Sequence, residues 1–227
     1  MTEKLLPAMP PGYRVVAALA AGAGLRWGEC LGLRWGSVDF DAATLTVSRV
    51  VVEVAGRVSS RPFPKTSASR RVIPLAPFLS AELKSVLAGL TPDPTASVVV
   101  GPDGGSLRRG NFRRRIWIPS LLRAGLIAGM RVESPTADGG HRLCWTDQTG
   151  KRQFRTFRTR AALFAHAARA TPDDALHFHD LRHCYATWLV SRGVPVNVVQ
   201  KVLGHQQAST TLNRYTHTPG DFLQQIR

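Results

Sequence analysis

Residues 179–183 read His-Asp-Leu-Arg-His and residues 203–205 read Leu-Gly-His, with Tyr215 standing a little further along the chain. Arginine neutralises phosphate oxygens through paired hydrogen bonds, and histidine exchanges protons near neutral pH. A phenol beside such cations becomes a usable nucleophile. These groups together predict chemistry on a phosphate.

A third segment, Gly-Leu-Arg-Trp-Gly-Glu at residues 24–29, lies far upstream, and its arginine opens a predicted amphipathic helix. Each of the three segments is a weak signal alone, but their order and spacing form a specific pattern. They resemble the tyrosine recombinases, the phage integrase family, in which a G-L-R-x-G-E box, an H-x-L-R-H box and L-G-H precede a late tyrosine. The resemblance extends from about Val15 to Thr218 and therefore covers nearly the whole chain.

The resemblance implies an α+β, mainly α-helical fold, with residues 1–227 forming one catalytic domain. Alternating β-branched residues at 44–54, a turn at Gly56 and a short strand at 71–75 predict a small three-stranded antiparallel sheet. Residues 141–157 predict an extra β-hairpin inside an insertion at about 130–160. This hairpin could contact DNA or a neighbouring subunit, or it could be a surface feature with no special role. The N-terminal core-binding domain of full recombinases is expected to be absent.

The resemblance also implies a set of catalytic residues. They are Arg26, Lys65, His179, Arg182, His205 and Tyr215. In this interpretation the two arginines and His205 bind the non-bridging oxygens of a DNA phosphate, and His179 accepts or relays the proton of the nucleophile. Glu29 and His183 are expected to support the site, with a surface carboxylate as the alternative for Glu29.

Tyr215 is expected to attack phosphorus and form a 3′-phosphotyrosyl bond, while Lys65 protonates the departing 5′ oxygen. Lys65 lies in the segment Pro-Lys-Thr-Ser-Ala-Ser-Arg at 64–70, ahead of the strand at 71–75. The family's catalytic lysine occupies a similar setting, K-T-x-x-S-x-R-x-I-P-L. An ordinary solvated turn lysine is the alternative.

Several other residues are candidates for contacts with the DNA backbone. They are Thr66, Ser67, Ser69, Arg70, Arg108, Arg109, Arg113 and Arg114. Residues 108–117 hold the densest group of arginines, and on a helix these side chains would spread around most of its circumference. Some must therefore face solvent, and a solvated face explains this group as well as a DNA-binding face does.

Composition narrows the class of partner. Thirty basic residues face fifteen acidic ones, giving a net charge of +15 and a pI near 11.2, which favours a polyanion and nucleic acid before a membrane. The three cysteines lie far apart, so the pattern indicates a reducing cytoplasm without a disulfide framework. The histidines at 177, 179 and 183 lack accompanying carboxylate or cysteine ligands, and we expect neither a metal nor another cofactor.

The leading hypothesis is a cytoplasmic site-specific DNA recombinase from a bacterium or an infecting phage, acting at the nucleoid on double-stranded DNA. It would be a monomer alone and would form a tetramer with other recombinase subunits on DNA. A type IB topoisomerase is a close alternative, because it uses similar chemistry. A non-catalytic DNA-binding module on the same scaffold and a basic RNA-binding protein are the alternatives from other classes.

Overall fold

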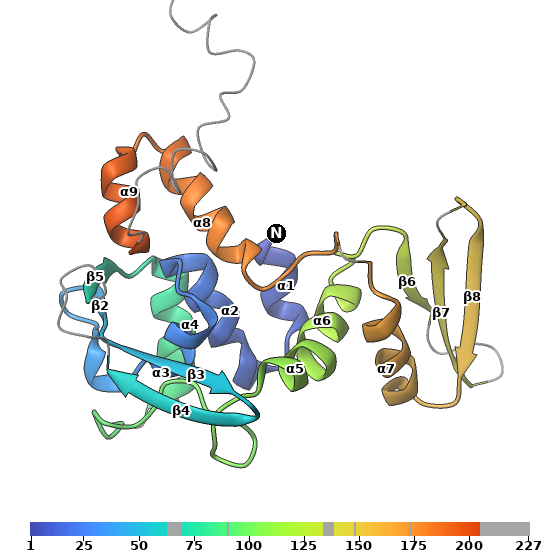
Figure 1. Ribbon diagram of the computed structural model, residues 1–227, viewed down its shortest axis with the longest axis horizontal. Coiled ribbons are helices and arrows are strands. Elements are labelled where there is room, and N and C mark those ends of the chain that lie inside the picture. Colours follow the sequence, from blue (N-terminus) through green and yellow to red (C-terminus); the bar gives the residue numbers. More distant parts are fainter. Residues whose placement is uncertain (63–69, 90, 134–138, 148, 173, 205–227) are drawn as a thin grey trace, which may run out of the picture.

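The computed structural model describes residues 1–62, 70–89, 91–133, 139–147, 149–172 and 174–204 (Figure 1). The first helices are α1 (Thr2–Ala8), α2 (Pro11–Ala23), α3 (Trp27–Gly32) and α4 (Pro77–Leu87). α2 is the central helix, because the run from Val15 to Ala20 is fully buried and α1, α3, α4 and α8 (Asp180–Ser191) all contact α2. Its left-handed cap at Gly24 turns the chain into α3.

Two small antiparallel sheets lie beside these helices. The strands are β1 (Val38–Asp39), β2 (Thr44–Val47), β3 (Arg49–Val54), β4 (Arg57–Pro62) and β5 (Arg71–Pro74), with a 3-10 turn at Trp35–Ser37. A three-stranded sheet is present in the order β1-β2-β5, with Leu45 opposite Ile73 in its buried centre, but β1 was not predicted and stands in place of the strand expected after Gly56. The expected long strand at 44–54 is interrupted at Ser48, so that β3 pairs with β4 as a separate hairpin.

A second helical group follows in the middle of the chain. It comprises α5 (Arg109–Phe112), a π-helical turn (Arg113–Trp117) and α6 (Ile118–Arg123). The arginine-rich segment is therefore helical, and its middle turn is widened. Phe112 and Trp117 are buried in the core, whereas Arg108, Arg109, Arg114 and Arg115 are exposed.

A third antiparallel sheet stands at the end of the molecule away from β2 and β5 (Figure 1). It consists of β6 (Met130–Glu133), β7 (His141–Thr146) and β8 (Arg152–Phe157), and α7 (Arg160–Ala170) packs against β7 and β8. The expected hairpin at 141–157 is confirmed in β7 and β8, while β6 and α7 were not anticipated. Leu143 and Leu163 are both fully buried, so sheet and helix share a core.

The last described elements are α8 and α9 (Val196–Leu203), which lie over the end of the molecule that carries β5 (Figure 1). α9 begins after Pro195 and ends at Gly204, whose φ of 65° is left-handed. Both features are as the sequence predicts. In the described part of the chain, the helices are too short or too polar to serve as membrane spans.

Candidate active site

Arg26 and Glu29 are brought together by the first turn of α3. Arg26 is the N-cap residue, as expected, and its backbone N–H donates to Glu29 Oε2 at 2.9 Å. Its side chain reaches the same carboxylate, because Nη1 donates to Oε1 at 2.9 Å. The Arg26 side chain is nevertheless 42% exposed, so it also faces outward.

Glu29 is the centre of an arginine cluster rather than a surface carboxylate. Its side chain is 1% exposed, and Arg71 binds both oxygens, with Nη1–Oε1 at 3.1 Å and Nη2–Oε2 at 2.7 Å. Arg182 Nη1 lies 3.9 Å from Oε2. Burial raises the pKa of the Glu29 carboxyl, but the hydrogen bond and charge of Arg71, together with Arg26, outweigh it and hold the pKa below its ordinary value.

Arg182 crosses the interior from α8. Its side chain is 1% exposed, Nη1 donates to the Gly24 carbonyl, and Nη2 donates to the Leu203 carbonyl at 2.6 Å. These two carbonyls stand at the ends of α2 and α9, so Arg182 joins three helices. The guanidinium thus lies within the protein, beside the carboxylate of Glu29.

The end of α9 is held by three arginines. Val202, Leu203 and Gly204 each present a carbonyl, and these accept from Arg71 Nε at 2.7 Å, Arg182 Nη2 at 2.6 Å and Arg26 Nη2 at 3.1 Å. The C-terminal carbonyls of a helix carry partial negative charge, which suits cationic partners. A side chain at Gly204 would also crowd Arg71, because a Cβ there would lie 3.0 Å from Nη1. The chain therefore leaves α9 from a fixed point beside Glu29.

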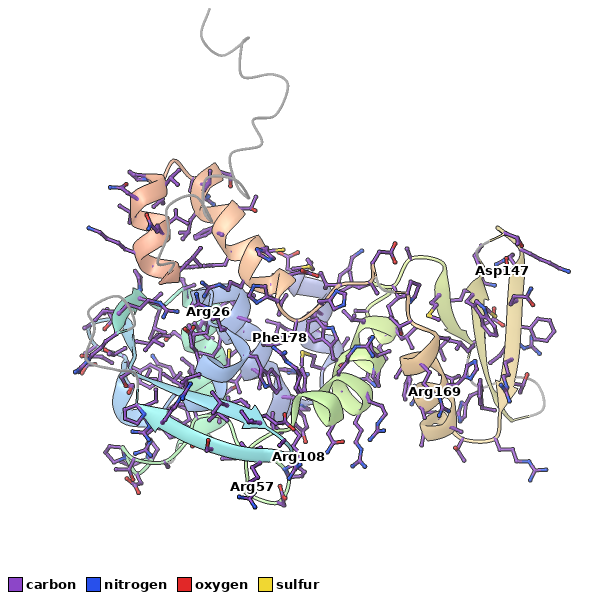
Figure 2. All side chains as sticks on the ribbon, viewed as in Figure 1. Arg26, Arg57, Arg108, Asp147, Arg169 and Phe178 are labelled. Carbon is purple, nitrogen blue, oxygen red and sulfur yellow. The ribbon has the colours of Figure 1, made fainter. Side chains whose placement is uncertain are left out.

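His179 lies at the start of α8, on the exposed side of the same centre. The preceding residue, Phe178, anchors this turn by packing edge-on against Trp27, Phe112 and Trp117, with ring centroids 5.2, 5.9 and 5.6 Å away. Figure 2 shows Phe178 near the middle of the molecule, with Arg26 to its left. The ring of His183 stands 4.8 Å from that of His179, edge to face.

Two hollows meet at Trp27, Arg109 and His179. One, of about 550 Å³, runs from Arg26 along the valines of β3, and the other, of about 380 Å³, enters the aromatic cluster around Phe178. Arg109 is exposed, and its backbone N–H donates to Glu53 Oε2 at 3.2 Å, which ties α5 to β3. Cationic and aromatic groups therefore border an open surface next to Arg26.

The sequence is similar to those of known recombinases and integrases. Residues 120–220 match the model of the phage integrase family. A tyrosine recombinase XerC-like protein of Caldanaerobacter subterraneus is 29% identical over 219 residues, which are 91% of this chain and 46% of that protein. The chain resembles the phage integrase family. A tyrosine recombinase XerC of Mycobacterium bovis is 36% identical over 115 residues, 49% of this chain and 37% of that protein.

Solved structures show that the fold is that of tyrosine recombinase catalytic domains. The Tn1549 transposon integrase in complex with circular intermediate DNA gives a TM-score of 0.59 at 18% identity, covering 94% of this chain and 58% of that one. The XerA recombinase gives a TM-score of 0.59 at 17% identity, covering 99% and 61%. The chain thus spans about half the length of the relatives it matches.

The structure brings together those candidate site residues that it describes. Arg26, Glu29, Arg182, His179 and His183 all come from α3 and the start of α8. Lys65, Thr66, Ser67, Ser69, His205 and Tyr215 lie outside the described residues. In the part of the chain that is described, no group of three metal-ligating side chains occurs.

The candidates for DNA contacts fall into two groups. Arg70, Arg108, Arg109 and Arg114 are exposed, and Arg109 borders both hollows. Arg113 is half-buried, and its Nη1 donates to the Ala168 carbonyl at 3.2 Å, so it also ties the π-helical turn to α7.

Arg71 is the one member of the cluster that sequence reasoning did not select. It occupies the arginine position of the K-T-x-x-S-x-R-x-I-P-L setting around Lys65. The alternation of β5, in which Arg71 and Ile73 are buried while Val72 and Pro74 are exposed, was the signal that could have placed it on the inner face.

Proposed function

We propose that this chain is the catalytic part of a site-specific DNA recombinase that cuts and rejoins strands through a 3′-phosphotyrosyl link without a metal ion. The observation that carries the proposal is the arginine cluster around Glu29, next to the exposed His179, in a chain whose residues 120–220 match the phage integrase family. Such a cluster suits a phosphodiester, whose transition state gathers charge on its non-bridging oxygens.

The charges of the cluster favour an anion. Arg26, Arg71 and Arg182 supply three positive charges and Glu29 supplies one negative charge, so the centre stays cationic after its internal pairing. Arg26 is the member with an outward face, and it would meet the phosphate first. Arg182 would complete the clamp when the phosphate competes with the Leu203 carbonyl for its Nη2 group.

The proposed reaction conserves the phosphodiester bond energy. The phenolic oxygen of Tyr215 forms a bond to phosphorus as the bond from phosphorus to the 5′ oxygen breaks. His179 takes the phenolic proton, and Lys65 supplies a proton to the departing 5′ oxygen. Attack by another 5′ hydroxyl reverses these transfers and joins a new strand, so no nucleotide cofactor is consumed.

Double-stranded DNA is the proposed partner, and other recombinase subunits, four in the synapse, are proposed to assemble on it. The net charge of +15 supports DNA binding, and so does the position of Arg109 beside Arg26 and His179. Among the structural neighbours, the Tn1549 integrase and the XerH recombinase were solved bound to DNA.

A covalent-trapping experiment tests the chemistry. The protein is mixed with a pool of nicked duplexes of random sequence in chelator and denatured in detergent, and the linked strands are sequenced to locate the cleaved phosphodiester. We expect adducts with wild type and with Tyr13→Phe, a matched phenol on α2, but none with Tyr215→Phe. Adducts that persist in Tyr215→Phe would reject this nucleophile. DNA binding without any adduct would favour the non-catalytic module.

A further inference from the structure

We propose that Arg71 is a positioning residue of this active site: it holds Glu29, and through Glu29 it orients Arg26, while it fixes the end of α9. The inference deepens the proposed recombinase function and rests on it. Arg71 itself is not proposed to touch DNA, because its side chain is only 7% exposed, against 42% for Arg26.

The bidentate contact to Glu29 is the first part of the argument. Glu29 Oε1 accepts from both Arg71 Nη1 and Arg26 Nη1, and Oε2 accepts from both Arg71 Nη2 and the Arg26 backbone. The planar guanidinium of Arg71 therefore fixes the plane of the Glu29 carboxylate, and this carboxylate in turn orients Arg26. Lysine would retain the charge but would not supply this fork of donors.

The contact to α9 is the second part. Arg71 Nε donates to the Val202 carbonyl at 2.7 Å, and two residues later Gly204 leads directly to His205 in the sequence. At its other end, Arg71 is the first residue of β5, which follows the segment that holds Lys65. The Arg71 side chain thus connects the Glu29 carboxylate to two segments of the chain. One contains Lys65 and the other leads to His205.

A purely structural role for Arg71 is the competing explanation. Both explanations predict slower DNA cleavage after substitution, so the test needs a measurement that loss of stability alone does not change. A methylphosphonate at the cleaved position provides one, because its transition state carries less negative charge and depends less on an oriented Arg26. Displacement of Arg26 should therefore slow a phosphodiester more than a methylphosphonate.

The experiment compares single-turnover cleavage of both substrates by wild type, Arg71→Lys and Arg14→Lys. Arg14 is a matched control, because its half-buried Nε donates to the Met9 carbonyl, about 15 Å along α2 from Gly24. We expect Arg71→Lys to slow phosphodiester cleavage about tenfold or more and to raise the methylphosphonate-to-phosphodiester rate ratio about fivefold. Arg14→Lys should leave this ratio unchanged. Equal slowing of both substrates by Arg71→Lys, or no slowing, would overturn the proposal.

A second variant and a binding measurement cover the cases in which Arg71→Lys does not fold or wild type does not cleave DNA. If Arg71→Lys does not fold, Glu29→Asp shortens the same contact from its other end and must raise the ratio in the same way. If wild type forms no adduct, the recombinase function fails, and positioning is then judged on DNA affinity. In that case Arg26→Lys should weaken binding by a smaller factor in the Arg71→Lys background than in wild type, and equal factors would reject the inference.

Discussion

At the scale of single residues, Glu29 is the group that makes the arginine cluster possible. A buried carboxylate is costly to desolvate, and three arginines repay that cost here through hydrogen bonds and charge. Removal of the carboxylate would leave Arg71 and Arg182 buried without their counter-ion. The same carboxylate thus serves stability and the proposed chemistry together.

The substitution Glu29→Gln should therefore lower the free energy of unfolding by about 3 kcal/mol at pH 7, as loss of one partner of a buried ion pair does. Glu3→Gln, at an exposed position in the first turn of α1, is the matched control and should change little. Urea unfolding monitored by circular dichroism measures both variants.

The stability conferred by Glu29 should also depend on pH. Because the pKa of folded Glu29 is held below its ordinary value, the unfolded carboxyl binds a proton first as the pH falls. The stabilisation is complete above the unfolded pKa, about 4.3, and is lost as the pH drops through the lower folded pKa. The gap in unfolding free energy between wild type and Glu29→Gln should thus narrow at low pH. A gap of the same size at pH 7 and pH 3 would contradict this explanation.

The sequence allows candidate site residues to be selected where a family motif contains them. Arg26, Glu29, Arg182 and His179 were all selected from local boxes, and the structure places them around one centre. Arg71 was missed because its importance lies in contacts with residues 42 and 131 positions away, Glu29 and Val202. Local patterns do not show such contacts, even though burial on alternate sides of β5 hints at an inner face.

At the scale of elements, α3 reaches its position through two glycines that lie against β3. A Cβ at Gly32 would lie 2.7 Å from the Arg49 carbonyl oxygen, and one at Gly28 would collide with the Val51 carbonyl. Backbone atoms cannot move aside as a flexible side chain can. Because α3 carries Arg26 and Glu29, this close approach sets the distance between the arginine cluster and the β3-β4 hairpin.

Gly32→Ala should therefore lower the free energy of unfolding by about 1–3 kcal/mol, the usual cost of overpacking a close contact. Gly12→Ala is the matched control, since a Cβ there would meet nothing within 4 Å and alanine favours the helix. Thermal and urea unfolding of the two variants should move in opposite directions. Equal stability of Gly32→Ala and wild type would show that α3 can shift away from β3 at little cost.

The elements themselves were predicted unevenly. Helices with clear start and stop residues, such as α9 between Pro195 and Gly204, were located within one residue. β6 was missed because its four residues, Met-Arg-Val-Glu, are too few and too polar to form an alternating pattern that stands out. α7 was missed because its alanines and arginines show no clear apolar stripe, and its burial comes from packing against α6, the π-helical turn, β7 and β8. Tertiary contacts therefore determine that β6 and α7 form.

At the scale of the whole molecule, the proposed function divides the excess of positive charge into side chains that contact DNA and side chains that are only solvated. Arg109 borders both hollows beside Arg26 and His179. Arg169 is also exposed but belongs to α7, well apart from Arg26 in Figure 2. The two arginines carry the same charge in different places. Substituting each in turn therefore distinguishes a local phosphate contact from the general attraction of a cationic protein for DNA.

Each phosphate contact releases condensed counterions, so the negative slope of log affinity against log salt decreases in magnitude by about 0.9 for each contact removed. Arg109→Gln should reduce the magnitude of that slope by about one and weaken binding about evenly across duplex sequences, because phosphates carry no base identity. Arg169→Gln should leave the slope unchanged, since distant charges are screened at physiological salt. Fluorescence anisotropy with one labelled duplex from 50 to 300 mM salt, roughly the range in which such slopes are measured, gives both values. Equal slopes for the two variants would mean that Arg109 belongs to the solvated surface and that DNA approaches Arg26 from another side.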